Sequence, residues 1–280
     1  MEAPYTVLVG DVATVQSRHL VRREDRDWIE SEIYHALVLA AMTELTKGTR
    51  VELAIVSGLP IQFFERDKAK LKDRLLGEHK VSRAGRRAQL FTVSKAVVIP
   101  QGFGALCSLC LDEKGALVRA DLANGRVGLI DVGGKTTNLL SVNRLAEVGR
   151  ETASVNVGAW DVARAVRRYL ADECPDLEVR DHELIQAIQA RRVKYFGKPV
   201  DLSAVIAAAV APLADQVIAE ATQLWNGAAG LDVILVAGGG AHLVGPAVQR
   251  HFRHAQVIGN DPVYANAEGY YRFAARLARG

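Results

Sequence analysis

One apolar run that leads into two adjacent glycines constrains the fold of this chain more than any other feature. The runs 127–130 and 139–142 are apolar, and between them lies Asp-Val-Gly-Gly-Lys-Thr-Thr-Asn at 131–138. Two short apolar runs joined by a glycine-containing turn predict a β-hairpin. Adjacent glycines let backbone N–H groups face one concavity, which suits phosphate oxygens. A hairpin that binds no ligand remains the alternative.

A second glycine-rich turn follows another apolar run. Residues 233–236 are apolar and lead into Ala-Gly-Gly-Gly-Ala at 237–241, and a helix is expected from about Val244. Glycines at a helix start allow a ligand close to the backbone, and the helix N-terminus favours anions. This turn does not fit the spacing G-x-G-x-x-G and lacks G-K-[ST], which argues against a dinucleotide-binding turn and a P-loop here. The alternative is a tight turn that needs glycine for packing.

Strand and helix patterns alternate along the 280 residues, which predicts a layered α/β fold. A hydrophobic content of 49% is enough for one large or two modest domains. The segment 114–125 is the one marked linker candidate. The expected strands are 5–9, 51–56, a hairpin within 80–99 that turns at Ala84-Gly85, 127–130, 139–142, 233–236 and 256–258; the expected helices are 27–45, 63–76, 102–111, 159–172, 181–190, 202–224, one from about 244, and 264–278.

Charge and cysteine content exclude several classes of protein. A formal net charge of +3 is too small for a dedicated nucleic-acid binder. No uninterrupted apolar run is long enough to span a bilayer. The three cysteines, Cys107, Cys110 and Cys174, argue against a disulfide framework and fit a reducing cytoplasm. Cys107 and Cys110 lack the partners of a zinc site, so we expect them to be buried on a helix face.

Three ordered motifs resemble the superfamily of actin, heat-shock chaperones and sugar kinases. D-V-G-G-K-T-T-N at 131–138 is similar to its second phosphate loop, and V-I-L-V-A-G-G-G-A-H-L at 233–243 is similar to its adenosine loop. D-P-V-Y-A-N-A-E-G at 261–269 resembles the opening of its closing helix. The helical insert and the ending at 264–271 look most like the ParM/StbA plasmid-segregation ATPases and their archaeal relatives. The resemblance begins at about Val7.

This resemblance implies two ribonuclease-H-like domains with ATP, ADP or GTP and Mg²⁺ in a cleft between them. Domain I would be 1–124, closed by helix 264–280, and domain II would be 125–263. Asp131 would face the metal, and Gln101 would orient the attacking water, a role that suits an uncharged amide. For Gln101 the alternative is a turn residue that precedes a helix. The phosphates and the adenosine would contact Gly133, Gly134, Lys135, Thr136 and Thr137 on one turn, and Gly238, Gly239, Gly240 and Ala241 on the other.

Two departures from the family pattern affect the expected activity. Many relatives carry Asp where this chain has Asn138. The superfamily opens with D-x-G-x-x-x-x-K, whereas this chain has Asp-Val-Ala-Thr-Val-Gln-Ser-Arg at 11–18, with Ala13 in place of glycine. We therefore expect a first domain truncated at its N-terminus, without the first phosphate loop. The resemblance then implies a weak ATPase only if that loop is present in the native protein.

The function that the resemblance implies is a cytoplasmic, nucleotide-dependent filament former for plasmid or DNA segregation. Its partners would be further copies of itself and a centromere-binding adaptor protein, with no direct nucleic acid and no membrane. Two alternatives stay open. One is a non-catalytic, truncated pseudo-ATPase scaffold. The other is a small-molecule kinase of the same superfamily, which would require a carboxylate aimed at a small substrate.

Overall fold

The computed structural model describes residues 6–17, 27–259 and 261–279. The chain divides into two compact units. Unit 1 comprises Met1–Val56 and Arg66–Val98, and unit 2 comprises Ser57–Glu65 and Ile99–Gly280. The bounds of these units differ from those of the predicted domains, 1–124 and 125–263. The predicted domain division stays a prediction.

Unit 1 contains most of a three-stranded sheet with the order β1-β3-β2. β2 and β3 pair as the predicted antiparallel hairpin. α2 begins after Ser31, whose hydroxyl oxygen accepts a hydrogen bond from the Tyr34 N–H (3.2 Å) and so caps the helix. The elements of this part of the chain are α1 (Asp11–Gln16), η1 (Trp28–Glu30), α2 (Glu32–Leu45), β1 (Arg50–Leu59), α3 (Ile61–Leu75), β2 (Gly77–Val81) and β3 (Gln89–Pro100).

The core of unit 1 forms between α2 and one face of its sheet. Phe91 and Val93 are two residues apart on β3, so their side chains leave the strand on the same face. Both are buried in one cluster with Met42 of α2. The buried residues of α2 are Ala36, Met42 and Thr43, whereas half of the surface of Leu37 is exposed.

Unit 2 is built on a six-stranded mixed sheet. Its order is β11-β10-β4-β5-β6, with β7 also pairing β5. β10 runs parallel to both β4 and β11, whereas β4 and β5 are antiparallel. The elements are α4 (Phe103–Cys110), α5 (Ala120–Asn124), β4 (Arg126–Val132), β5 (Thr137–Asn143), β6 (Ala146–Glu147), η2 (Gly149–Glu151), β7 (Ala153–Val155), α6 (Ala159–Glu173), α7 (Asp181–Ala190), β8 (Arg192–Tyr195), β9 (Lys198–Asp201), α8 (Ser203–Leu224), β10 (Val233–Ala237), α9 (Ala241–His251), β11 (Ala255–Val257) and α10 (Ala265–Leu277).

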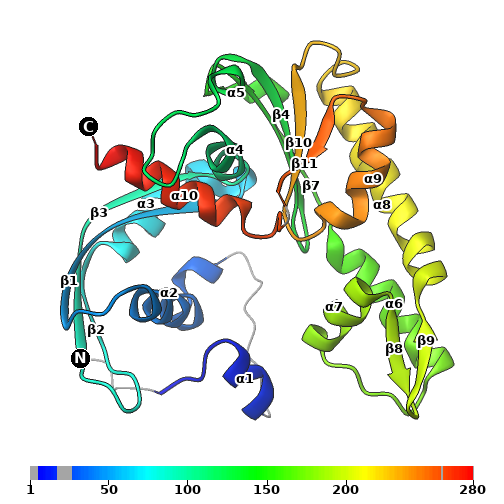
Figure 1. Cartoon of the computed structure of the whole chain (residues 1–280), viewed down its shortest axis with the longest axis horizontal. Coiled ribbons are helices and arrows are strands. Elements are labelled where there is room, and N and C mark those ends of the chain that lie inside the picture. The colour runs from blue at the N-terminus through cyan, green and yellow to red at the C-terminus, as the bar shows by residue number, and fades with distance from the viewer. Residues whose placement is uncertain (1–5, 18–26, 260, 280) are drawn as a thin grey trace. The chain divides into compact units, whose positions relative to one another are not determined.

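Helices cover both faces of the unit 2 sheet, which gives three layers. Figure 1 shows α4 and α10 on one side of the sheet and α8 and α9 on the other. Alternation along β4 explains this, because Val127 and Leu129 belong to the cluster with α4, while Ile130 and Val132 belong to the cluster with α6, α8 and α9. A strand that is buried on both faces reads as a continuous apolar run. The α/β fold class predicted from the sequence is confirmed.

Most predicted elements are present, with five corrections. Residues 6–9 are not a strand, and Tyr5 lies outside the described residues. The strand predicted for 51–56 continues through Ser57-Gly58 to Leu59, and the helix predicted from 244 begins at Ala241. The linker candidate 114–125 contains α5, and the carboxylate of Asp112 accepts hydrogen bonds from two N–H groups at its start. The hairpin β8–β9 was missed.

α8 is long and apolar enough, by length and composition alone, to cross a membrane. It is the one helix of the described residues that meets this test, and 28% of its apolar window is buried. A core helix of a globular unit meets the same test, so the finding is weak. In unit 2, α8 contacts α6 and α9.

Candidate functional site

The two glycine-rich turns lie side by side at one edge of the unit 2 sheet. β4 and β10 are adjacent and parallel, and Ala237 at the end of β10 is level with Asp131 on β4. The chain therefore leaves both strands at the same edge. The N–H of Gly240 donates to the carbonyl oxygen of Val132 (2.9 Å), which joins the two turns directly. In open α/β sheets this carboxyl edge is where ligands bind.

Gly238 can only be glycine at this position. Its φ is +87°, in the left-handed region that other residues rarely adopt. A Cβ there would also lie 2.5 Å from Oδ1 of Asp131 and 2.5 Å from the carbonyl oxygen of Val132. At Gly240 a Cβ would lie 2.4 Å from Cγ1 of Val132, whereas at Gly239 the nearest atom is 3.5 Å away. The second turn is thus pressed against the end of β4.

The first turn is fixed by the start of α6. The carbonyl oxygens of Gly133 and Gly134 accept hydrogen bonds from the N–H groups of Ala159 (2.9 Å) and Trp160 (2.8 Å). In a trans peptide the C=O and the following N–H point in opposite directions. The N–H groups of Gly134 and Lys135 therefore point away from α6. This turn can offer two consecutive backbone N–H groups, those of Gly134 and Lys135, to an anion, whereas the N–H of Gly133 donates to the carbonyl oxygen of Thr136 (2.9 Å).

Thr136 and Thr137 have different surroundings. Thr137 is completely buried in β5, and its hydroxyl donates to the carbonyl oxygen of Val157 (2.8 Å). That hydroxyl already holds the fold together, so we do not expect it to donate to a phosphate. Thr136 precedes the strand and is partly exposed. Asn138 is buried, and its side-chain oxygen accepts a hydrogen bond from Ser154 (2.9 Å).

Asp131 is a buried carboxylate at the centre of this edge. It is 6% exposed, and it lies on the face of β4 that carries Val127 and Leu129, toward α4 and α10. Burial raises the pKa of Asp131, because the charged form loses hydration. The side-chain amide of Asn266 acts in the opposite direction, since its Nδ2 donates to Oδ2 of Asp131 (2.8 Å). The carboxylate is therefore held between Gly238 and Asn266.

Asn266 is a residue of this edge that was not predicted from the sequence. It lies in the first turn of α10, and its Oδ1 accepts hydrogen bonds from the N–H groups of Gly102 (2.9 Å) and Ala105 (3.1 Å) at the start of α4. Asn266 stands within the D-P-V-Y-A-N-A-E-G motif, but the motif does not reveal what the amide contacts. Its partners lie far away in sequence, so only the folded chain identifies it.

Gln101 lies in the turn between β3 and α4. Its N–H donates to the carbonyl oxygen of Leu59 (2.8 Å), and Gly102 after it has φ +92°. Gln101 is partly buried. Gly102, the next residue, donates its N–H to Oδ1 of Asn266, and Nδ2 of Asn266 donates to Oδ2 of Asp131. The structure thus connects the two residues for which the sequence predicts catalytic roles.

The donor set at this edge suits one kind of metal ion. Within the described part of the chain, no group of three or more His, Cys, Asp and Glu side chains could hold a metal. A zinc site or an all-protein calcium site does not fit that arrangement. Mg²⁺ keeps several waters and needs only one or two carboxylates beside substrate phosphates, so a single carboxylate such as Asp131 fits it.

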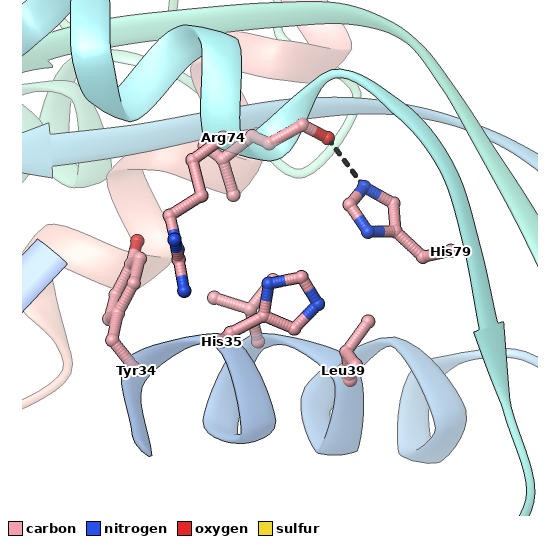
Figure 2. Close-up of a pocket in the computed structure, with 7 residues that line it drawn as sticks. Tyr34, His35, Leu39, Arg74 and His79 are labelled. Atoms are coloured by element: carbon pink, nitrogen blue, oxygen red, sulfur yellow. Dashed lines mark hydrogen bonds between the residues drawn. The ribbon is translucent and has the colours of Figure 1, made fainter. Parts of the chain in front are cut away.

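Two hollows lie elsewhere in the molecule. Figure 2 shows the one in unit 1, where His35 and His79 face each other with ring centroids 5.5 Å apart beside Arg74. Its volume is about 10 Å³, space for one water at most. The other hollow, of about 460 Å³, is at the opposite end of β4. It is lined by Arg126, Arg150, Glu151, Leu224, Trp225, Asn226, Ala229, Gly230 and Leu231.

The prediction for the cysteines is confirmed. Cys107, Cys110 and Cys174 are free and buried. Burial raises the pKa of Cys107 to about 12 and that of Cys110 to about 11. Neither thiol is a ready nucleophile or metal ligand at neutral pH, because the thiolate is the reactive form.

Two families match the chain in consecutive parts. The family described as actin-like proteins, N-terminal domain, matches residues 4–104, and the family described as archaeal actin homologue MreB-like, C-terminal, matches residues 129–250. No curated protein matches the chain by sequence.

Several solved structures have the same fold. An archaeal actin homologue in complex with ADP is 24% identical with a TM-score of 0.75, and the match covers 90% of this chain and 79% of that one. A ParM filament from Clostridium botulinum is 25% identical with a TM-score of 0.73 and coverages of 90% and 75%. ParM from Bacillus thuringiensis with ATP is 14% identical with a TM-score of 0.71 and coverages of 96% and 80%.

Proposed function

We propose that this chain, which belongs to the actin-like family, binds ATP or ADP at the two glycine turns of unit 2 and self-associates into filaments under the control of that nucleotide. The observation that carries the proposal is the contact between Gly238 and Asp131, at the ends of two adjacent parallel strands. A left-handed glycine pressed against a buried carboxylate leaves backbone, rather than side chains, at the edge where a phosphate chain would lie.

The residues divide into two groups under this proposal. At the first turn, the N–H groups of Gly134 and Lys135 point away from α6 and bind the β- and γ-phosphates together with Thr136. The N–H of Gly133 closes this turn on the carbonyl oxygen of Thr136 (2.9 Å), and Thr137 supports it from within β5. The second group binds the α-phosphate and the adenosine where α9 begins, because a helix N-terminus favours anions. It consists of Gly238, Gly239, Gly240 and Ala241.

Asp131 faces the metal in this proposal, and Gln101 orients the water that attacks the γ-phosphate. A Mg²⁺ ion, when bound, neutralises charge that develops on the phosphates. Gln101 lacks a charge and so positions water without acting as a strong base. The proposed activity is a weak ATPase, on the condition that the native protein carries the first phosphate loop.

Self-association is the proposed output of nucleotide binding. A ParM relative from Clostridium botulinum is known as a 15-stranded filament. We propose the same kind of assembly for this chain, in the cytoplasm and in plasmid or DNA segregation. DNA is then reached through a separate centromere-binding adaptor, and neither nucleic acid nor membrane is a direct partner.

A non-catalytic scaffold is the second candidate. The observation in its favour is that Asp131 is buried, already hydrogen-bonded, and not part of any larger cluster of metal ligands among the described residues. A chain of this kind would bind nucleotide and assemble without turnover.

Nucleotide binding in the presence and absence of Mg²⁺ tests the proposal. Wild-type protein is titrated with ATP and ADP by calorimetry, with Mg²⁺ or with EDTA, and sedimentation measures assembly. We expect Asp131→Asn to weaken ATP binding about tenfold with Mg²⁺, the loss of one charge-assisted contact, and to change little in EDTA. Sedimentation is expected to increase with ATP and Mg²⁺.

Asp121→Asn is the matched control, because Asp121 is an exposed carboxylate of the same unit that pairs with Arg119. It should bind ATP like wild type under both conditions. A folded wild-type protein that binds neither nucleotide would refute the proposed function. Binding and assembly without phosphate release would instead favour the scaffold.

A further inference from the structure

We propose that Asn266 is a positioning residue that couples what binds Asp131 to the turn that carries Gln101. This inference rests on the proposed function, because it concerns the same carboxylate and the same water-orienting residue. It goes further in assigning a route between them. The route consists of one side-chain amide with a partner at each end.

The orientation of the Asn266 amide is determined by its surroundings. Its oxygen accepts two backbone N–H groups, from Gly102 and Ala105. Rotating the amide by half a turn would bring its NH₂ group against these donors, which would cost hydrogen bonds at both ends. Nδ2 must therefore face Asp131. The carboxylate has little room toward the second turn, because a Cβ placed on Gly238 would lie only 2.5 Å from its Oδ1.

Where α4 and α10 cross, their backbones lie in close contact near Asn266. A Cβ at Gly269 of α10 would lie 1.6 Å from the carbonyl oxygen of Gly104 of α4. A Cβ at Gly104 would lie 2.4 Å from Cε1 of Tyr270 and 2.7 Å from the backbone oxygen of Asn266. The two helices meet backbone to backbone, and tightly packed interiors transmit strain instead of damping it. A displacement of Asn266 consequently moves the first turn of α4.

Gln101 directly precedes the first turn of α4. It precedes Gly102, whose N–H is one of the two donors to Asn266 and whose φ of +92° marks a special turn conformation. A ligand that attracts the Asp131 carboxylate weakens the hydrogen bond that Nδ2 of Asn266 donates to it. The amide then relaxes, and the turn at Gln101 shifts with it. Asn266 thus acts on the reacting region through other residues and touches no substrate itself.

A double-mutant cycle in nucleotide-free protein tests the coupling. The readout is hydrogen exchange at the amides of Gly102 and Ala105, resolved by NMR. We expect Asn266→Leu to accelerate both about tenfold, since each loses a hydrogen-bond acceptor. Asp131→Ala should accelerate the same two amides several-fold, although Asp131 does not contact them. On the Asn266→Leu background, Asp131→Ala should add nothing further.

The amides of Ala159 and Trp160 are the matched control. They also bind carbonyl groups near the end of β4, at Gly133 and Gly134, but they are not joined to Asn266. Asp131→Ala should leave their exchange unchanged. Equal acceleration at all four amides would mean general destabilisation and would overturn the proposal. So would unchanged exchange at Gly102 and Ala105 in Asp131→Ala.

Asn266→Asp separates the two ends of the route. Its side chain still accepts from Gly102 and Ala105, and at a pH where both carboxylates are ionised it cannot donate to Asp131. At that pH we expect protected amides that no longer respond to ADP with Mg²⁺. Wild type should respond, and Asn266→Leu should not. A response that persists in Asn266→Leu would refute the route. Failure of wild type to bind ADP would refute the proposed function, while the nucleotide-free cycle would still decide whether the coupling exists.

Discussion

The two glycine turns of unit 2 look alike in sequence but need glycine for different reasons. Position 238 needs glycine because of its own backbone. Its φ is +87°, and a Cβ there would overlap the end of β4. Gly134 does not have a left-handed φ, and what a Cβ would meet is the ring of Trp160, 2.4 Å away. One requirement is intrinsic to the turn, and the other depends on a neighbouring side chain. Only the second can be relieved by a change elsewhere.

Gly238→Ala should have the largest effect. The new Cβ meets Asp131 Oδ1 and the Val132 carbonyl at 2.5 Å in a conformation that alanine disfavours. We expect a loss of about 3 kcal/mol or more in the free energy of unfolding, measured by urea denaturation. Gly239→Ala is the control. Its Cβ would lie 3.5 Å from Val263, an ordinary contact, so its stability should remain close to that of wild type.

Gly134→Ala should cost less and should be reversible by a second change. Its Cβ overlaps only the Trp160 ring, a partly buried side chain that can shift. We expect a loss of roughly 1–3 kcal/mol, typical of overpacking. Adding Trp160→Leu removes the ring and should recover part of that loss. If the double variant loses as much free energy of unfolding as the two single variants lose together, the proposed difference between the turns is wrong.

A contact at the other end of β4 provides a test outside both turns. Nη2 of Arg126 donates to both oxygens of Glu151 (2.6 and 2.7 Å), and this contact lowers the pKa of Glu151. The stability that it contributes is present above the unfolded pKa of about 4.3 and is lost as pH falls through the lower folded value. We expect Arg126→Met to cost about 1–2 kcal/mol at pH 7 and much less near pH 3.

The control for this prediction is Arg119→Met, which breaks the exposed pair with Asp121. Exposed pairs contribute little, so urea denaturation at both pH values should hardly change. Nucleotide binding should survive in Arg126→Met, because Arg126 lies at the opposite end of the strand from Asp131. A pH-independent loss in Arg126→Met would contradict the assigned role of Glu151.

The layers of unit 2 could be predicted because they follow from local pattern. Apolar runs bounded by glycine predict β4, β5 and β10, and helical periodicity predicts α6, α7 and α8. The hairpin β8–β9 was missed because its turn has Phe196 and Gly197 with positive φ, where Asn-Gly is usual, and because Pro199 lies within β9. The local signals there contradict the structure that forms.

The candidate site could be predicted only in part. The glycines and Asp131 stand in contiguous motifs, so the sequence alone indicates both turns. Asn266 is 135 positions from Asp131, and the pairing exists only because β4 and α10 become neighbours on folding. The resemblance implied that Thr137 binds phosphate together with Thr136, but Thr137 lies in β5 with its hydroxyl on a backbone carbonyl, whereas Thr136 precedes the strand. The partner of Thr137, Val157, is 20 positions away.

The smallest expected effect separates these two threonines. Thr137→Val keeps the side-chain shape but leaves the buried Val157 carbonyl without its donor, so we expect a loss of about 1 kcal/mol in stability. Thr136→Val should leave stability unchanged and weaken ADP binding, measured by calorimetry, because Thr136 stays at the turn. The opposite result, a stability loss in Thr136→Val and weaker ADP binding in a stable Thr137→Val, would reverse their roles. It would also mean that β5, and not the turn before it, faces the phosphates.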